Sequence, residues 1–305
     1  MEQGQLRALR ELGDRGSIAA VAAALHVTPS SVSQQISALQ RQSPAPLTFK
    51  SGRRTALTDA GRALAAAAID VEVALERAGQ AVASFQGDLS GAVSVAAFHS
   101  AGLALFGPLI AATAGRDQPQ VRLTDFDVAQ EAFPSLTPDH DLVLAHRLVG
   151  SPPWPTSVRV EPLLFEPLDI AVRRDHPLAA QSSVEPADLR DAEWVAVHEG
   201  FPLEQAITVI AGIGGSEARI IHRINDFALA AAVISASGSV ALMPRYTTDL
   251  RDHPELVLRP LSSPGLGRYI DCLARPETLE RATVATVLSH IRAIATGLIH
   301  DRPAA

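Results

Sequence analysis

The chain has 305 residues, of which 47% are hydrophobic, 4% aromatic and 19% charged, and its formal net charge is −7 at pH 7. This length suffices for two or three hydrophobic cores, and no apolar run of about twenty residues free of charge is present, so we expect no membrane span. The start, MEQGQLRAL, lacks the apolar stretch of a signal peptide, so we expect a cytoplasmic protein.

Three helices are predicted within the first forty-one residues. Leucines recur on one face of the first helix, and Gly13 and Gly16 end it. Ser17 caps the second helix, and Thr28 caps the third, which has Pro29 in its first turn. The polar face of the third helix carries hydroxyl and amide groups, which suit phosphate oxygens and base edges. The residues that we expect to contact DNA here are Thr28, Pro29, Ser30, Ser31, Ser33, Gln34 and Gln35.

A basic hairpin is predicted after these helices. Lys50, Arg53 and Arg54 gather around Gly52, and such a loop can insert an arginine into a minor groove. Three apolar residues are expected to anchor the hairpin: Leu47, Phe49 and Leu57. The polar face of the third helix alone is equally consistent with an ordinary amphipathic helix that faces solvent. The basic hairpin is what favours DNA binding.

The charge distribution agrees with a DNA-binding end. Residues 1–60 hold seven Lys and Arg against four Asp and Glu, a net charge of +3, which leaves −10 for the rest of the chain. A basic end on an acidic body indicates a DNA-binding module joined to a body with another task.

Residues 58–87 are predicted to form one long helix, from Thr58 as its N-cap to Gly87. Its apolar residues alternate at spacings of four and three, which is typical of a coiled-coil seam, although a helix packed on its own domain would show a similar pattern. We favour a dimer seam, because the charged residues lie off it. Its members are Leu64, Ala68, Val71, Leu75, Ala78, Val82 and Phe85.

Strands and helices alternate from residue 92 onward, which indicates an α/β region with mostly parallel strands. The predicted strands are Ala92–Ala97, Val121–Phe126, Asp141–Ala145, Leu168–Val172, Trp194–His198, Val240–Met243, Val257–Leu261 and Tyr269–Ala274. The predicted helices are Leu103–Thr113, Phe227–Ser235 and Glu277–Leu298.

The first 61 residues resemble the LysR-type transcriptional regulators. The matching motifs include Gly16-Ser17, Leu25-His26-Val27-Thr28, Val32-Ser33-Gln34-Gln35-Ile36, Leu57-Thr58 and Ala60-Gly61. The resemblance implies a winged helix-turn-helix followed by a linker helix that pairs two chains. Several positions depart from the family pattern, namely Pro29-Ser30, Gln40, Ser43-Pro44, Thr48 and Lys50.

The rest of the chain resembles the effector domain of the same family, which is similar to the periplasmic binding-protein fold. The matching residues include Asp141-Leu142-Val143, Asp175-His176-Pro177 and Ala236-Ser237-Gly238. The fold implied is a mixed α/β multidomain chain: a DNA-binding domain at 1–60, a dimerisation helix at 61–88 and an effector domain at 89–305. The effector domain would have one lobe at about 91–163 and 268–305 and another at about 164–267, joined by two crossover strands.

An effector would lie between the lobes, at the carboxyl ends of strands, where helix N-termini offer N–H groups. Ser100 is the first candidate for a hydrogen bond to it, although a plain helix cap fits equally, and Asn225 and Asp226 could likewise cap a helix. The low aromatic content argues against a stacking-rich pocket. The effector candidates are His99, Ser100, Phe126, Asp127, His198, Glu199, Asn225 and Asp226.

Evidence for catalysis is weak. Asp139-His140-Asp141 with His146 comes nearest to a metal cluster, and we interpret these as solvated and packed side chains. The run Gly212–Gly215 lacks the spacing of a phosphate-binding loop, and no nucleophile motif is present. The single cysteine, Cys272, excludes an internal disulfide, and its apolar neighbours favour a buried structural thiol over a redox sensor. We expect no enzyme, no metal and no cofactor.

The sequence therefore predicts a ligand-responsive transcription factor. Its expected partners are double-stranded DNA, a small-molecule effector and further copies of itself in a homodimer or homotetramer, and such a regulator can also contact RNA polymerase. Two alternatives stay open: an architectural DNA-binding protein without an effector, and a small-molecule-binding protein or enzyme built on the C-terminal lobes.

Overall fold

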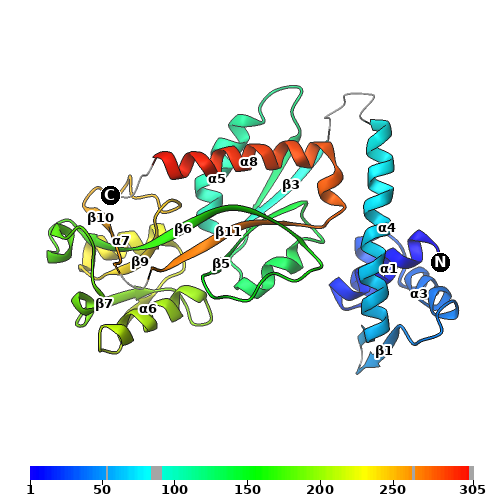
Figure 1. Ribbon diagram of the computed structural model, residues 1–305, viewed down its shortest axis with the longest axis horizontal. Coiled ribbons are helices and arrows are strands. Elements are labelled where there is room, and N and C mark those ends of the chain that lie inside the picture. Colours follow the sequence, from blue (N-terminus) through cyan, green and yellow to red (C-terminus); the bar gives the residue numbers. More distant parts are fainter. Residues whose placement is uncertain (53, 84–90, 263–264, 302–305) are drawn as a thin grey trace.

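The computed structural model describes residues 1–52, 54–83, 91–262 and 265–301 (Figure 1). The N-terminal helices gather at one end of the molecule around a long helix, and a larger α/β body forms the other end. The elements of the first part are α1 (Gln3–Arg15), α2 (Ile18–Ala24), α3 (Pro29–Arg41), β1 (Thr48–Ser51), β2 (Arg54–Leu57) and α4 (Asp59–Ala83).

The three predicted N-terminal helices and the hairpin are confirmed. The Ser17 hydroxyl accepts a hydrogen bond from the Ala20 N–H at 3.2 Å, and the Thr28 hydroxyl accepts one from the Ser31 N–H, also at 3.2 Å. Each side chain thus satisfies an N–H group that the first helical turn leaves without a partner. Gly16 ends α1 in the left-handed conformation, at φ 68°.

Helix α4 begins where the sequence predicts. The Thr58 hydroxyl accepts a hydrogen bond from the Gly61 N–H at 3.0 Å. The predicted end at Gly87, and Phe85 of the predicted seam, lie outside the described residues.

The first two positions of the predicted seam need a correction. Ala68 is buried in the core of the N-terminal domain and Leu64 packs against that core, because α1 lies across this part of α4. The later apolar positions Val71, Leu75 and Val82 are exposed, at 39%, 44% and 68%, and Ala78 is exposed as well. A dimer seam can therefore involve only the C-terminal half of the helix.

The described part of the α/β body contains nine strands, three of them longer than the sequence predicts. Its strands are β3 (Ala92–Ala97), β4 (Gln120–Asp125), β5 (Leu142–Leu148), β6 (Arg159–Arg173), β7 (Glu193–Ala196), β8 (Arg219–Arg223), β9 (Ala241–Pro244), β10 (Leu256–Pro260) and β11 (Gly267–Ala274). Its α-helices are α5 (His99–Ala112), α6 (Pro202–Ile213), α7 (Phe227–Ser237) and α8 (Ala282–Asp301). Short 3-10 turns lie at Gln130–Leu136, Pro177–Ala180, Pro186–Leu189 and Thr278–Glu280.

The main sheet has the strand order β10-β6-β11-β5-β3-β4, with β9 also pairing β6. The expectation of mostly parallel strands is wrong. Strand β3 pairs β4 and β5 in parallel, and β7 pairs β8 in parallel, but all pairings of β6 and β11 are antiparallel. The reason is that β6 runs from one lobe into the other and β11 lies beside it in the opposite direction. The predicted lobe boundary near residue 163 falls inside β6.

Three groups of buried apolar side chains fill the lobes. The first lies between α5, α8 and the strands β3, β5 and β11. In the other lobe, one group lies between β6, β7, β9 and α6, and another lies against α7. Helix α8 is long and apolar enough to cross a membrane by length and composition alone, and no other described helix is. Its Val284, Val287 and Ile291 are buried in the first core, so one face of α8 packs against the sheet.

Two glycines of α4 provide a matched test of this packing. A Cβ on Gly61 would lie 2.0 Å from the Leu47 carbonyl oxygen, whereas a Cβ on Gly79 would meet nothing within 4 Å. We expect Gly61→Ala to destabilise the N-terminal domain by about 2 kcal/mol or more, because backbone must shift. Gly79→Ala should instead stabilise the helix by up to about 1 kcal/mol. Denaturant unfolding of both variants checks this, and equal effects would contradict the packing.

Candidate nucleic-acid interface and inter-lobe pocket

The polar face of α3 is largely free. Val32, Ile36 and Leu39 are buried, so the helix has one side in the core and the other in solvent. Of the predicted DNA contacts, Thr28, Pro29, Ser30, Ser33 and Gln34 are exposed, and Ser31 and Gln35 are half-buried.

These side chains differ in how free they are to bind. The Ser33 hydroxyl donates to the Pro29 carbonyl oxygen at 2.9 Å, and the Thr28 and Ser30 hydroxyls lie 2.9 Å apart. Within the described part of the chain, no hydrogen bond ties down the Gln34 amide, which leaves both its donor and its acceptor available. Gln34 is therefore the side chain of α3 best prepared to read a base edge.

Gln35 departs from its predicted place on the reading face. Its amide nitrogen lies 3.7 Å from where a Cβ of Gly4 in α1 would be, and its Oε1 is buried without a hydrogen-bond partner among the described residues. The side chain therefore turns toward α1.

The hairpin adds two exposed cations. Lys50 and Arg54 are exposed on β1 and β2, while Arg53 lies outside the described residues. Leu47 and Leu57 anchor the hairpin at 2% and 6% exposure. Phe49 does not anchor it, because it is half exposed on the outer side.

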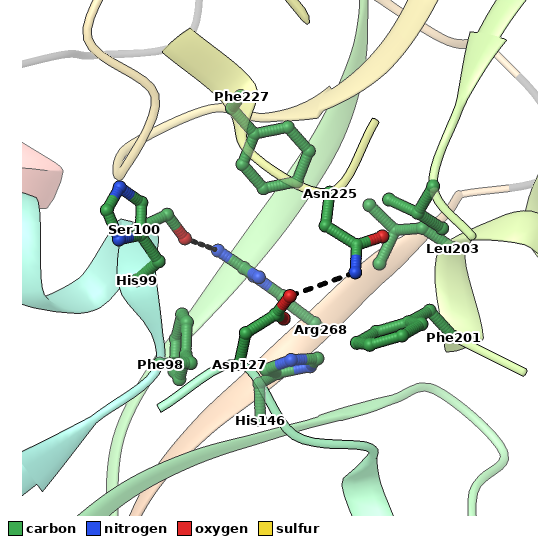
Figure 2. A pocket seen from close by; sticks show the side chains of 11 residues that line it. Phe98, His99, Ser100, Asp127, His146, Phe201, Leu203, Asn225, Phe227 and Arg268 are labelled. Carbon is green, nitrogen blue, oxygen red and sulfur yellow. Dashed lines mark hydrogen bonds between the residues drawn. The ribbon is translucent and has the colours of Figure 1, made fainter. Parts of the chain in front are cut away.

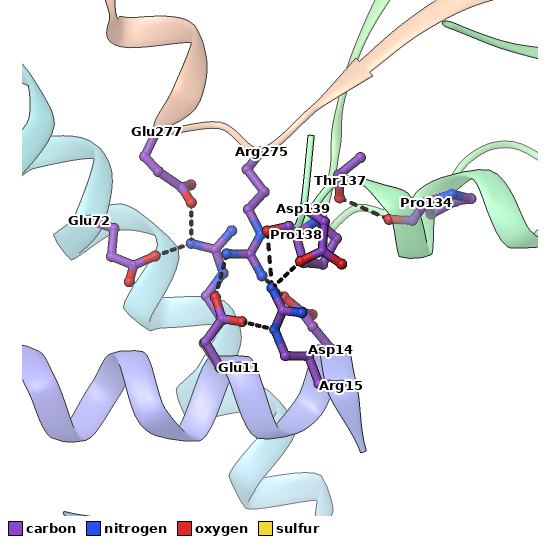
Figure 3. A network of polar contacts seen from close by, with 11 residues as sticks. Glu11, Asp14, Arg15, Glu72, Pro134, Thr137, Pro138, Asp139, Arg275 and Glu277 are labelled. Atoms are coloured by element: carbon purple, nitrogen blue, oxygen red, sulfur yellow. Dashed lines mark hydrogen bonds and ion pairs between the residues drawn. The ribbon is translucent and has the colours of Figure 1, made fainter. Parts of the chain in front are cut away.

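Two arginines counted toward the basic N-terminal end are bound elsewhere. Figure 3 shows an ionic cluster between α1, α4 and the effector domain. Arg10 pairs with Glu72 and with Glu277, the latter at 2.8 Å, and Arg15 pairs with Glu11 at 2.6 Å and with Asp139 at 2.9 Å. Arg10 is only 4% exposed. These two charges therefore hold the chain together and are not free for DNA.

Arg275 completes this cluster from the effector domain. It reaches Glu11 and Asp14 of α1, each at 2.5 Å. Burial raises the pKa of Glu11, but the nearby Arg275 and Arg15 outweigh it and hold that pKa below its ordinary value. The Glu11 carboxylate is thus stabilised in its charged form by both arginines.

A small pocket with about 50 Å³ of space for water-sized groups opens between the lobes (Figure 2). Its walls combine three phenylalanines with a few polar groups, an arrangement typical of small-molecule sites. The residues that line it are Phe98, His99, Ser100, Asp127, His146, Val197, Phe201, Leu203, Asn225, Phe227 and Arg268.

A buried ion pair supports the pocket. Arg268 Nε donates to Glu166 Oε2 at 2.8 Å, and the two side chains are 2% and 0% exposed. Arg268 Nη2 also donates to the Ser100 hydroxyl at 3.0 Å and to the Thr247 hydroxyl at 2.8 Å. The guanidinium lies 4.8 Å from the ring centre of Phe98, a cation–π contact.

His146 brings a neutral polar group to the same pocket. It is 8% exposed, and burial, aided by the charge of Arg268, lowers its pKa well below the ordinary value. Its Nδ1 has no hydrogen-bond partner among the described residues. A ligand in the pocket can supply one, because a neutral imidazole offers one donor and one acceptor.

Two polar contacts join the lobes beside the pocket. His99 Nε2 lies 2.7 Å from Asp226 Oδ2, and the Asn225 amide donates to Asp127 Oδ2 at 3.0 Å. Both contacts join the end of a strand or the start of α5 in one lobe to the start of α7 in the other. All four side chains are at least partly exposed, so water can replace these bonds when the lobes separate.

The structure brings together four of the eight predicted effector residues, His99, Ser100, Asp127 and Asn225. The other four, Phe126, His198, Glu199 and Asp226, do not line the pocket. Phe126 packs against the core of the first lobe, and the His198 N–H donates to Asn225. Glu199 pairs with Arg223 in solvent, and Asp226 caps α7 by accepting from the Leu229 N–H at 2.7 Å.

Several pocket residues escaped sequence reasoning. Three of the nine phenylalanines line the pocket, more than the low aromatic content led us to expect. Phe201 and Leu203 belong to α6 and its start, a helix the sequence analysis did not predict. The sequence did offer one clue to Arg268, because this charged residue directly precedes the predicted apolar strand Tyr269–Ala274.

The residues that came nearest to a metal cluster are dispersed. Asp139 pairs with Arg15, and Asp141 accepts from the Ser94 N–H at 2.8 Å. His140 packs edge-on against Phe126, while His146 lies in the pocket. Nowhere in the described ranges do three or more His, Cys, Asp or Glu side chains converge as a metal site would require.

Cys272 is fully buried in β11, and burial raises the pKa of its thiol from 9.0 to about 12. We expect the folded protein to react with iodoacetamide at pH 8 about a thousandfold more slowly than the unfolded chain, because the thiolate is the nucleophile. The thiol should also favour the folded state below pH 9, a contribution lost as pH rises toward 12. Fast alkylation of the native protein would contradict this burial.

Comparison with known proteins agrees with both halves of the chain. Residues 4–62 match the model of bacterial regulatory helix-turn-helix proteins of the lysR family, and residues 86–295 match that of the LysR substrate binding domain. A RuBisCO operon transcriptional regulator of Acidithiobacillus ferrooxidans is 29% identical over 197 residues, which cover 64% of this chain and 62% of that protein. The transcriptional dual regulator GltC of Bacillus subtilis is 26% identical over 93% of this chain and 94% of its own length.

Solved structures share the whole architecture. Full-length OxyR from Pseudomonas aeruginosa has a TM-score of 0.65 at 18% identity, over 97% of this chain and 94% of that one. CbnR, a LysR family regulator, has a TM-score of 0.53 at 23% identity, over 96% of this chain and all of that one. Since the two family models together span almost the entire sequence, the chain belongs to the LysR family of transcriptional regulators.

Proposed function

We propose that this regulator reads DNA through α3 and its hairpin. The exposed Gln34 lies on a face of α3 lined with hydroxyl groups, and an amide can bind the major-groove edge of adenine through two hydrogen bonds. Lys50 and Arg54 lie on the hairpin that follows α3 in the chain and suit phosphate or minor-groove contacts. The free polar face of α3 is the observation that carries this proposal, and a CbnR structure with its target DNA supports it by likeness of fold.

The protein acts as a homodimer or a larger assembly in this proposal. Val71, Leu75 and Val82 expose an apolar stripe on the C-terminal half of α4. Two such stripes packed together would place two α3 helices on one side of the duplex, about one helical turn apart.

An effector binds in the inter-lobe pocket and sets the DNA-binding state. The pocket has polar groups from both lobes, so one ligand can contact Ser100 on one side and Asn225 on the other. The regulatory domain of CcmR, a structure of similar fold, was solved in complex with 2-PG. A ligand that binds one arrangement of the lobes more tightly than another would shift the protein toward the first. The coupling free energy between effector and DNA binding is typically about 1–3 kcal/mol.

The same proposal makes the protein a cytoplasmic regulator that works by binding and not by catalysis. The described pocket groups form a hydrogen-bonding and apolar lining, with Arg268 already paired to Glu166. An architectural DNA-binding protein would not need such a pocket, which is why we favour the effector-responsive function.

Two substitutions distinguish contacts to the DNA phosphates from contacts to the bases. With DNA selected from a random pool by the purified protein, Arg54→Ala should lower the slope of log affinity against log salt by about 1, since one phosphate contact is lost. Gln34→Ala should leave that slope and reduce discrimination between selected and scrambled DNA by about 1–3 kcal/mol. Fluorescence anisotropy titrations over several salt concentrations measure both effects.

Arg251→Ala is the matched control, because Arg251 is exposed in the effector domain and, among the described residues, forms its ion pair with the neighbouring Asp249. It should change neither the slope nor the discrimination. If Arg54→Ala and Gln34→Ala behaved like this control, the proposed DNA interface would be wrong.

A further inference from the structure

We propose that β11 connects the inter-lobe pocket to the DNA-binding domain, and that the ionic cluster at its end is the element that an effector releases. We call this cluster the clasp: Arg10, Glu11, Asp14 and Arg15 of α1 with Glu72 of α4 and Asp139, Arg275 and Glu277 of the effector domain. The inference concerns how the pocket is coupled to DNA binding and rests on the proposed function.

One end of β11 lies in the pocket. Arg268 is the second residue of the strand, and its guanidinium donates to Ser100 (Figure 2). It also donates to Thr247 and Glu166, so it joins three segments around the ligand space. A ligand that takes hydrogen bonds from Ser100 or Arg268 must alter these contacts.

The other end of β11 lies at the clasp. The strand ends at Ala274. Arg275 follows directly and donates hydrogen bonds to the carboxylates of Glu11 and Asp14 in α1 (Figure 3). Two residues further on, Glu277 accepts from Arg10 at 2.8 Å. Arg275 and Glu277, which both bind α1, thus directly follow the strand that begins at the pocket.

The strand between them is paired on both edges. Its pairing with β5 is regular from Arg268 to Leu273, and its pairing with β6 shifts register once, between Ile270 and Asp271. Asp271 in its middle is 2% exposed and accepts from Arg147 at 3.1 Å and from Trp154 at 2.7 Å. Seven residues of extended chain separate Arg268 from Arg275, roughly 20 Å, so a small tilt at one end displaces the other.

The clasp is suited to opening because its contacts are ionic and incompletely satisfied. Arg275 Nε and Glu277 Oε2 are buried without hydrogen-bond partners among the described residues. Burial also raises the pKa of Glu72, partly offset by Arg10. Such unpaired polar groups offset part of the gain from the ion pairs, and the separated charges would be well solvated. The closed and open states can therefore lie close in free energy, as a switch requires.

Hydrogen–deuterium exchange of the full-length protein tests this coupling without a known ligand. Arg275→Ala removes the main anchor and should raise exchange of the α1 amides, residues 3–15, about fivefold or more. Arg268→Lys keeps the charge beside Glu166 but loses the contacts of the guanidinium fork to Ser100 and Thr247, and it should raise α1 exchange in the same way. Arg251→Ala serves as the control and should leave α1 unchanged.

The double variant Arg268→Lys with Arg275→Ala decides the mechanism. If both act on one clasp, its α1 exchange should equal that of Arg275→Ala alone, because a clasp that is already open cannot open further. Additive effects, or no effect of Arg268→Lys on α1, would overturn the coupling through β11. Unchanged α1 exchange in Arg275→Ala would overturn the clasp itself.

Ser100→Ala provides a second pocket variant if Arg268→Lys fails to fold. It removes one acceptor of Arg268 and leaves the pair with Glu166 intact, and it should also raise α1 exchange. The outcome is independent of the DNA interface: if the salt-slope test on Arg54 failed while the exchange pattern held, the DNA proposal would be wrong and the coupling would stand.

Discussion

The buried ion pair between Glu166 and Arg268 is the interaction on which the two-lobed body depends. It joins β6 and β11, the strands that run between the lobes, at a point where neither side chain meets water. Taking two charges out of water is costly, and a structure tolerates it only when the remaining hydrogen-bonding groups find partners. Glu166 Oε1 accepts from the backbone N–H groups of Tyr246 and Thr247 at 2.7 and 2.6 Å, so the second lobe is fixed to the same carboxylate.

This arrangement also determines what the pocket offers a ligand. Since Glu166 neutralises Arg268 from behind, the guanidinium presents directed N–H groups without a net positive charge in the site. His146 is kept neutral by burial and by Arg268, and Phe98 lies against both groups. The ligand space therefore favours hydrogen bonding and aromatic contact over simple charge attraction.

The sequence predicted those elements that are stabilised by residues close together in the chain. The caps at Ser17, Thr28 and Thr58 appear where expected, because each hydroxyl bonds a backbone N–H only three residues away. Strand Ala92–Ala97 has the predicted bounds, since one face is buried throughout by Val93, Val95 and Ala97. The first half of β6 was missed because Pro162 and Pro167 interrupt it, and the partner strand β11, a hundred residues later, is what makes it a strand.

The functional sites were predicted only in part, because they depend on residues that meet through the fold. Arg10 and Arg15 have the composition of a DNA-binding surface, yet their partners Glu277 and Asp139 lie more than a hundred positions away and bind them to the effector domain. The pocket likewise draws Phe98, Phe201 and Arg268 from distant segments. No local sequence pattern predicts that these distant residues meet. The exposed face of α3, in contrast, follows directly from the helical spacing of its apolar residues.

We propose that this chain is a site-specific DNA-binding regulator that works as a dimer or larger assembly. Nuclease footprinting of the full-length protein on the DNA directly upstream of its own gene, at near-physiological salt with nonspecific competitor, measures this binding. We expect protection with dyad symmetry, in half-sites separated by about one helical turn or a multiple of it. Absence of protection there and throughout a random genomic pool would contradict specific reading by α3.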